Sequence, residues 1–330
     1  MKAIKTIGII TVAGLVGAGA ATYATTSFFL KKTLIRQGGV NQKIVDKFAD
    51  SKKMSEYMEK MSPIKEWMAK RELENVYIKS RDDIKLHAYY LAADEKTDKV
   101  AIMHHGFSSK AMDNMVQAKF LHDLGFEVLM LDMRAHGESE GDYVGFGILD
   151  RFDTLEWIKY VKAWFGNDVK LVLQGVSMGG TTALMALGIK EIQDSVSAVI
   201  ADCAFTSPAE IFSKVFKDNF HIFPKPIISL SSIKSKKMAG FSFDDYSTVD
   251  ALIGNKVPVL FIHGKEDLFV PTWMSEKNYE VCTSPKELLM VENAGHGSSA
   301  FENPELYRDT MTAFLKKYFP EISSDCTEKA

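Results

Sequence analysis

The 330-residue sequence has few cysteines and almost no excess of charge, and each shortage excludes a class of protein. Its three cysteines, Cys203, Cys282 and Cys326, are too few and too widely spaced for a disulfide framework or a paired-cysteine zinc site. We expect free thiols, with Cys203 buried. The formal net charge is -3, so no general basic surface favours nucleic acid as a partner. The sequence also lacks internal repeats and low-complexity tracts.

One segment lacks charge altogether. Residues 7–30 contain no charged side chain and follow a short basic start, Lys2 and Lys5. As a helix that rises about 1.5 Å per residue they would be about 36 Å long, enough to cross the core of a bilayer. We therefore predict a membrane anchor within residues 1–36, with the rest of the chain outside the cytoplasm. Two alternatives stay open: a cleaved secretion signal, which the small residues at 20–24 would suit, and the opposite orientation, which the basic residues after the run favour.

The next part of the chain predicts a helical connector. Residues 37–73 carry apolar side chains at helical spacing, among them Ile44, Phe48 and Met61, with an interruption expected at Pro63. A stripe of methionine and aromatic residues is typical of packing surface, so we assign the connector no chemistry.

Residues 74–330 change to short β-rich runs that alternate with amphipathic helical stretches, which is typical of an α/β domain with a mostly parallel sheet. Two runs joined at Asp82 and Asp83 predict an antiparallel hairpin. Six continuous apolar runs predict strands covered by helices on both faces, giving eight strands in all. The strands are expected at 75–80, 84–93, 99–105, 127–133, 169–176, 196–203, 257–264 and 286–292, and the helices at 110–124, 148–165, 178–191, 270–280 and 304–318.

An insert at residues 204–250 separates two of these strands by far more than an ordinary crossover. It carries an apolar helical edge and additional phenylalanines, namely Ile211, Phe212, Val215, Phe216, Phe220, Phe223, Phe241 and Phe243. Two interpretations stay open: a small cap that walls an apolar pocket, and ordinary packing on the sheet.

The stretch Gly175-Val176-Ser177-Met178-Gly179 follows a predicted strand and precedes a predicted helix. Glycines on both sides permit the sharp turn that exposes a serine hydroxyl, the arrangement called a nucleophile elbow. Ser177 is therefore the candidate nucleophile.

A serine nucleophile needs a base, and the base needs an acid that orients it. Asp267 and His296 each follow a later strand, so the chain order is serine, acid, histidine. Loops at the carboxyl ends of parallel strands meet at one edge of a sheet, where we expect these three side chains to lie together. Glu266 and Asp202 stay open as alternative acids.

Backbone N–H groups should hold the negative charge that develops on an attacked carbonyl oxygen. The candidates are Met178, directly after the nucleophile, and Phe107, in the loop after the third strand. Gly106 in that loop would allow the backbone to approach closely.

These motifs resemble those of the α/β-hydrolase superfamily. They are especially similar to bacterial membrane-anchored serine hydrolases of the group that also contains esterases, monoglyceride lipases and proline-iminopeptidase-like enzymes. The resemblance covers about residues 74–319 and is carried by MHHGFSS, LDMRAHGESEG, GVSMGG, IADCAFTS, VPVLFIHGKEDLFVP and AGHGSS. One departure is Ala135, where the pattern D-x-R-G-H-G-x-S of the family has glycine.

The resemblance implies an α/β-hydrolase fold with a cap at about 204–250. The expected function is hydrolysis of a carboxylic ester, with an apolar acyl part, by Ser177, His296 and Asp267 through an acyl-enzyme, without a metal or organic cofactor. A peptidase or amidase of the same fold and a noncatalytic binding module are the alternatives.

Overall fold

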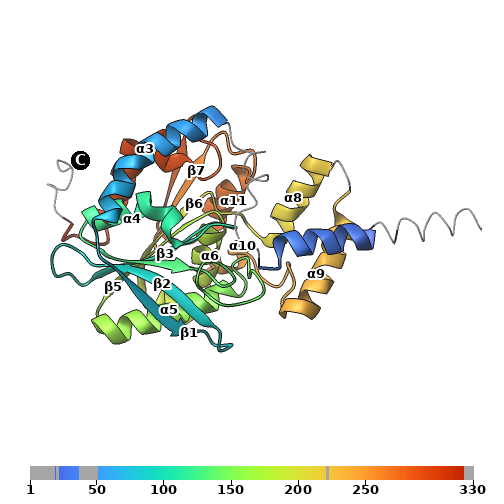
Figure 1. The fold of residues 1–330 in the computed structure, drawn as a ribbon, viewed down its shortest axis with the longest axis horizontal. Helices are drawn as coiled ribbons and strands as arrows, with labels where there is room; N and C mark the ends of the chain where they lie inside the picture. Colours follow the sequence, from blue (N-terminus) through green and yellow to red (C-terminus); the bar gives the residue numbers. More distant parts are fainter. Residues whose placement is uncertain (1–18, 20–21, 37–50, 221–222, 323–330) are drawn as a thin grey trace, which may run out of the picture.

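The structure is a computed structural model that describes residues 19, 22–36, 51–220 and 223–322. An eight-stranded sheet runs through the molecule, with helices on both faces and a group of helices that projects from one end (Figure 1). Strand β2 is antiparallel to β1 and β4, and the other five neighbouring pairs are parallel. The sheet order is β1-β2-β4-β3-β5-β6-β7-β8, with β1 (Leu73–Lys79), β2 (Lys85–Leu91), β3 (Lys99–His104), β4 (Glu127–Asp132), β5 (Lys170–Val176), β6 (Val196–Asp202), β7 (Val259–Gly264) and β8 (Lys286–Val291). This confirms the predicted eight-stranded, mostly parallel sheet and its hairpin.

The central strands are buried on both faces because a layer of helices covers each. Along β3, Ala101 and Met103 pack into one core while Val100 and Ile102 pack into the other, the two-residue alternation of a strand. The first core contains side chains of α3 (Ser51–Ala69), α4 (Met115–Asp123), α12 (Ser299–Glu302) and α13 (Pro304–Lys316). The second contains side chains of α5 (Asp150–Phe165), α6 (Met178–Ala186), α7 (Lys190–Gln193), α10 (Thr248–Leu252) and α11 (Trp273–Val281).

Two predicted helix boundaries are wrong. Helix α3 continues through Pro63, and the hydrogen bond lost there is offset because Met61, Ile64 and Trp67 pack on the core. The helix expected at 178–191 ends at Ala186. The turn that follows contains Gly188, where a side chain would lie 1.7 Å from the Tyr246 hydroxyl. Close packing by a distant residue therefore sets this boundary.

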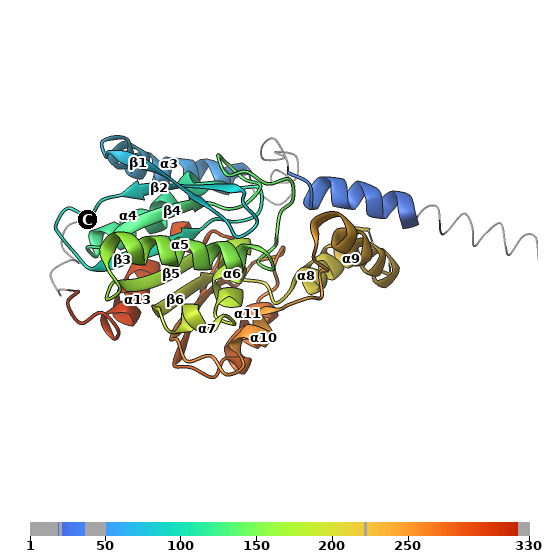
Figure 2. The ribbon, with the colours of Figure 1, turned by 90° about the horizontal axis from the view of Figure 1, so that it is seen from below.

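The insert forms α8 (Pro208–Phe220) and α9 (Lys225–Ala239), which project from the strand ends (Figure 1). A third helix, residues 22–33, lies across them (Figure 2). The Phe29 ring lies 4.9 Å from the Phe212 ring and 4.8 Å from the Phe216 ring. We call residues 22–36 together with α8 and α9 the cap. Its third helix comes from the predicted anchor region, which the sequence analysis did not foresee.

No helix within residues 19, 22–36, 51–220 and 223–322 has both the length and the apolar character needed to cross a membrane. Most of the predicted span at 7–30 lies outside the described residues, as do residues 37–50 of the connector and Cys326. In the described part of that span, Phe29 and Leu30 are buried in the cap rather than presented to lipid.

The cap is also fastened to the body through the end of this N-terminal segment. Leu34 is fully buried, and its carbonyl accepts a hydrogen bond from Val144 N–H at 2.8 Å. Arg36 N–H donates to the Asp142 carbonyl at 2.8 Å, and its guanidinium donates to the carbonyl oxygens of Gly137 and Ser139. The segment thus ties the cap to the loop that follows β4.

Candidate active site

Ser177 occupies a strained turn between β5 and α6. Its φ of 56° and ψ of -117° lie in a region that non-glycine residues rarely adopt. Side chains at the flanking glycines would collide with backbone: a Cβ on Gly175 would lie 2.3 Å from the Gly179 carbonyl, and one on Gly179 would lie 2.1 Å from the His104 oxygen. The Ser177 N–H donates to the Asp202 carbonyl at 2.8 Å, which fixes the turn against β6. The elbow geometry expected from the sequence is therefore present.

The structure brings Ser177, His296 and Asp267 into one chain of hydrogen bonds. His296 Nε2 lies 2.9 Å from Ser177 Oγ, and His296 Nδ1 lies 2.7 Å from Asp267 Oδ2. With Nδ1 protonated and donating to the carboxylate, Nε2 is free to accept the serine proton. The three residues come from the loops after β5, β7 and β8.

Asp267 is held by its own loop as well as by His296. Its Oδ1 accepts hydrogen bonds from Phe269 N–H at 2.9 Å and Val270 N–H at 2.8 Å. Burial raises the pKa of this carboxyl, but the charge of His296 and the hydrogen bonds from His263 and His296 lower it more, and the net pKa lies below its usual value. Asp267 is therefore an anion with a fixed orientation.

The two alternative acids do not occupy this position. Glu266 is exposed. Asp202 is fully buried, and the hydroxyl of Ser299 lies 3.4 Å from its Oδ1. Burial raises the pKa of Asp202 to about 6. Among the acids weighed from the sequence, Asp267 is the one hydrogen-bonded to His296.

The environment of His296 favours its charged form. Burial lowers its pKa, but the adjacent carboxylate of Asp267 raises it more, to well above the usual value. An imidazolium at this position is stabilised at the moment when the base would carry the proton of the nucleophile.

The first predicted oxyanion donor directly follows Ser177, and the loop that contains the second approaches it. Met178 is the first residue of α6, and the first amides of a helix have no intrahelical acceptor. In the loop after β3, a Cβ on Gly106 would lie 3.6 Å from Ser177 Cβ, which brings the Gly106-Phe107 backbone against the nucleophile. The aromatic ring of Phe107 stacks on Phe146, with ring centroids 5.5 Å apart.

The sequence analysis did not single out His263, which contacts the acid in the structure. This fully buried side chain lies with Nε2 3.2 Å from Asp267 Oδ2, and the same nitrogen is 2.9 Å from the Val270 carbonyl. Its Nδ1 lies 2.7 Å from Ser275 Oγ. His263 therefore contacts the carboxylate of Asp267 as a second histidine, in addition to His296. Its place at the end of β7, four residues before Asp267, is the signal that could have indicated this.

Cys203 is buried with a free thiol, as predicted, and it lies next to the histidine. Burial raises its pKa to about 11, so the thiol is neutral. Within the described part of the chain, Cys203, Asp267 and His296 are the one group of potential metal ligands, with donor atoms within 4.8 Å of one another. A metal there would have to displace the hydrogen bond between Asp267 and His296.

A row of aromatic rings connects this site to the cap. The Phe146 ring, stacked on Phe107, lies 5.0 Å from the Phe212 ring of α8, which in turn contacts Phe29. Near the base, Phe269 lies 5.0 Å from the His296 ring. Of the insert's phenylalanines, Phe212, Phe216, Phe241 and Phe243 are buried and Phe223 is exposed. The insert therefore supplies an apolar cluster above the strand ends.

The loop after β4 supports the site through a second polar network. Asp132 accepts hydrogen bonds from Ala111 N–H and Glu138 N–H, both at 2.9 Å, and lies 2.8 Å from His87 Nδ1. Ala135 has a φ of 62°, a conformation that glycine adopts without strain, and glycine is the residue that the resembled family pattern has at this position.

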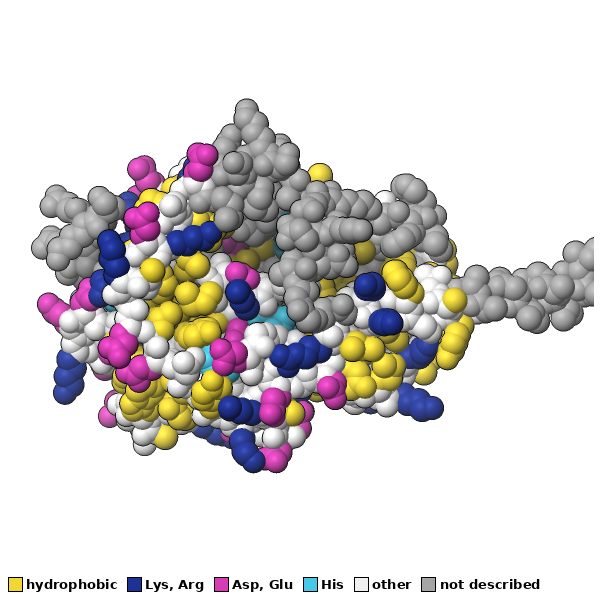
Figure 3. Space-filling view, viewed as in Figure 1, with side chains coloured by type: hydrophobic (Ala, Val, Ile, Leu, Met, Phe, Trp, Pro, Cys, Tyr) yellow, Lys and Arg dark blue, Asp and Glu magenta, His cyan; other side chains and the backbone are white. Residues whose placement is uncertain are grey.

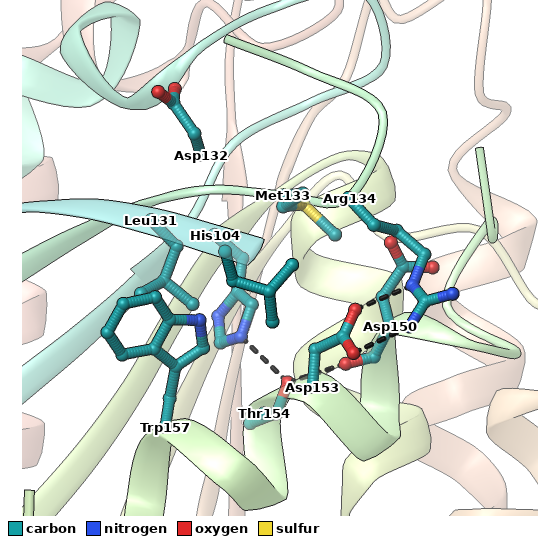
Figure 4. Close-up of a pocket in the computed structure, with 10 residues that line it drawn as sticks. His104, Leu131, Asp132, Met133, Arg134, Asp150, Asp153, Thr154 and Trp157 are labelled. Atoms are coloured by element: carbon teal, nitrogen blue, oxygen red, sulfur yellow. Dashed lines mark hydrogen bonds and ion pairs between the residues drawn. The ribbon is translucent and has the colours of Figure 1, made fainter. Parts of the chain in front are cut away.

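A small cavity lies nearby, lined in part by His104, Arg134 and Asp153, and Figure 4 shows the Arg134 to Asp153 pairing and the His104 to Thr154 hydrogen bond. Burial lowers the pKa of His104 to about 4, so it is neutral. None of the three hydrogen-bonded site residues lines this cavity.

Comparison with known proteins agrees with this architecture. A family model described as alpha/beta hydrolase fold matches residues 100–226. The uncharacterized protein YqkD of Bacillus subtilis is 28% identical over 226 residues, 68% of this chain and 74% of that protein. The alpha/beta hydrolase domain-containing protein WAV2 of Arabidopsis thaliana is 27% identical over 261 residues, 77% of this chain and 82% of its own. The structure of the Pyrococcus furiosus esterase Pf2001 superposes with a TM-score of 0.61 and 24% identity, over 75% of this chain and 92% of the esterase.

Proposed function

From the chain's membership of the α/β-hydrolase superfamily and from the contacts of Ser177, we propose that this protein is a serine hydrolase that cleaves carboxylic esters. One observation carries the proposal. A serine on a strained turn is hydrogen-bonded to a histidine, which is hydrogen-bonded to a buried, ionised carboxylate. A serine that only formed a turn would need neither the strained backbone nor a histidine and a carboxylate hydrogen-bonded in this order.

The reaction follows from these contacts. Ser177 Oγ attacks the ester carbonyl carbon while His296 Nε2 takes the hydroxyl proton, and the amides of Met178 and Phe107 hold the resulting oxyanion. The intermediate collapses as His296 returns that proton to the leaving alkoxide, which departs as the alcohol. A water then attacks the acyl-enzyme with His296 again as base, and the carboxylic acid and free Ser177 result.

The surroundings support an ester with an apolar acyl group over an amine-bearing peptide. The aromatic row from Phe107 to Phe212 offers apolar surface. A peptidase that recognises a free amine needs an unpaired acid. The five acids of the insert already have partners: Glu210 with Lys277, Asp218 with Lys214, Asp244 with Ser232, Asp245 with Lys236 and Asp250 with Ser247. Pf2001, whose structure superposes on this chain, is named an esterase.

A fluorophosphonate probe tests the chemistry, because it reacts with activated serines. We expect the wild-type chain to be labelled and S177A to be unlabelled but folded. Hydrolysis of p-nitrophenyl esters of graded acyl length, measured beside proline amides, tests the ester preference. Wild-type ester turnover in S177A would refute the nucleophile, and failure of a folded wild-type sample to react would favour a noncatalytic binding module.

We further propose that residues 7–30 tether the protein to a membrane, with the catalytic domain outside the cytoplasm. The support is the lack of charge of this run. Because residues 22–30 form part of the cap helix, the lipid-embedded part would be residues 7–21. Retention of the full chain in the membrane fraction after alkaline carbonate extraction tests the tether. Release into the medium with a shortened N-terminus would indicate a cleaved signal instead.

A further inference from the structure

The cap has an unusual share of the exposed apolar surface. Of the eleven large hydrophobic side chains that are exposed in the described chain, five lie in residues 22–36 and 223–239. They are Tyr23, Phe28, Phe223, Ile233 and Met238. Two short stretches thus carry nearly half of these side chains, although the cap also has a well-filled apolar interior. Surface of this kind marks an interaction site.

The same two helices carry positive charge and no acid. The helix at residues 22–33 contains Lys31 and Lys32, and α9 contains Lys225, Lys234, Lys236 and Lys237, whereas neither contains aspartate or glutamate. Lys236 pairs with Asp245 from the following loop. Figure 3 shows hydrophobic and basic side chains interleaved over the projecting end of the molecule.

The two helices form one continuous surface. Lys234 Nζ donates to Ser27 Oγ at 2.7 Å and lies 3.9 Å from the centre of the Tyr23 ring. Ile233 is adjacent to Lys234 in α9, and Phe28 is adjacent to Ser27 in the N-terminal helix. We call the five exposed apolar side chains and the six lysines of these helices the cap face.

We propose that the cap face lies on the surface of an anionic lipid bilayer. Aromatic side chains with lysines around them are suited to the interface between headgroups and acyl chains, where each lysine gains from negatively charged lipid. The uncharged run at 7–30 itself contains Tyr23 and Phe28, so this part of the cap face belongs to a stretch of sequence that suits lipid. A protein partner would not account for that run.

Aromatic packing also connects the cap face to the site of the proposed reaction. The Phe29 ring on the inner side of the N-terminal helix contacts Phe212, which contacts Phe146 above the loop of Phe107. Direct packing within the cap therefore connects the cap face to the aromatic side chains above the site. This arrangement suits an ester that enters the site from the bilayer. This consequence rests on the proposed function; the cap face itself does not.

A local probe distinguishes contact of the cap face from attachment by residues 7–30. In a C326S background the remaining cysteines, Cys203 and Cys282, are buried, so I233C can be labelled with the dye NBD. I253C is a matched control, because Ile253 is 64% exposed and Ile233 is 66% exposed, but Ile253 follows α10 on the body. The labelled full chains are reconstituted into phosphatidylcholine vesicles with and without phosphatidylglycerol, and nitroxide-labelled lipid serves as quencher.

We expect blue-shifted emission and several-fold stronger quenching at position 233 than at position 253 in vesicles that contain phosphatidylglycerol. The triple variant K225Q/K236Q/K237Q should reduce quenching at position 233 to the level in pure phosphatidylcholine. The control K159Q/K190Q/K265Q, which changes three exposed lysines of the body, should leave it unchanged.

Equal quenching at the two positions would overturn the proposal, as would equal quenching at position 233 in neutral and anionic vesicles. A blue shift without lipid that grows with protein concentration would indicate a second copy of the chain as the occupant instead. Fluorophosphonate labelling of the same samples reports the serine separately, so loss of labelling with intact quenching would refute the proposed hydrolase and leave the cap face standing.

Discussion

The substitution D267N isolates the role of the carboxylate with little change in shape. An asparagine can still accept the hydrogen bonds from Phe269 and Val270 N–H through Oδ1. Its amide nitrogen then faces His296 Nδ1, where the carboxylate oxygen now lies at 2.7 Å. Because the amide donates, Nδ1 must become the acceptor, and the ring proton moves to Nε2, the atom 2.9 Å from Ser177 Oγ. The base can no longer accept the serine proton.

The magnitude follows from the loss of the correct tautomer. A change of this kind lowers kcat by about 10⁴-fold, which corresponds to about 5.4 kcal/mol of transition-state stabilisation. Stability should change little, whereas D267A would strand two N–H groups at about 1–3 kcal/mol each. The assay is kcat/KM on a p-nitrophenyl ester, with the rate of fluorophosphonate labelling as a second readout and thermal unfolding as the test of fold.

Two neighbouring acids provide the controls. E266Q changes an exposed carboxylate beside Asp267 and should retain wild-type activity. D202N changes a buried carboxylate that ends β6 and should retain the serine-histidine-acid geometry. Near-normal activity in D267N, together with loss of activity in either control, would refute the assignment of the acid.

Three further predictions concern pH and stability. Asp267 raises the pKa of His296, and the neutral imidazole is the active form of the base. We therefore expect kcat/KM to rise with pH through a midpoint above the usual histidine pKa of about 6.5. A midpoint below that value would contradict the pairing of Asp267 with His296. A135G should stabilise the fold by about 1 kcal/mol in denaturant titrations, because residue 135 has a φ of 62°. L34A should destabilise it by about 2–5 kcal/mol, because Leu34 is fully buried where the cap joins the body. L306A, at a half-exposed position, should have little effect, and equal losses in the two variants would argue against docking of the N-terminal segment.

Much of the fold could be predicted because it depends on local pattern. Continuous apolar runs correspond to β3 through β8, and the Asp82-Asp83 turn corresponds to the hairpin of β1 and β2. The errors arose where a distant residue decides the outcome. Packing of α3 on the core carries that helix through Pro63, and Tyr246 occupies the space beside Gly188.

The candidate site could be predicted in part for the same reason. Chain order and strand ends indicated Ser177, Asp267 and His296, since parallel strands bring their carboxyl ends together. The choice among Asp267, Glu266 and Asp202 required side-chain directions, because neighbouring residues in a loop point to different places. His263 and Cys203 lie within motifs of the family, but no pattern assigned them a role, and their contacts with the acid and the base exist only in the folded chain.

The sequence by itself determined the alternating architecture, the glycine-bounded serine turn and the uncharged run at the start of the chain, because each of these depends on neighbouring residues. Tertiary structure alone decided that Phe29, Leu30 and Leu34 belong to the cap. An apolar helix has the same pattern whether its partner is lipid or protein, so only the presence of Phe212 and Phe216 against Phe29 distinguishes the two. The physical reason is that the hydrophobic effect is not directional, and it rewards burial without specifying the surface that provides it.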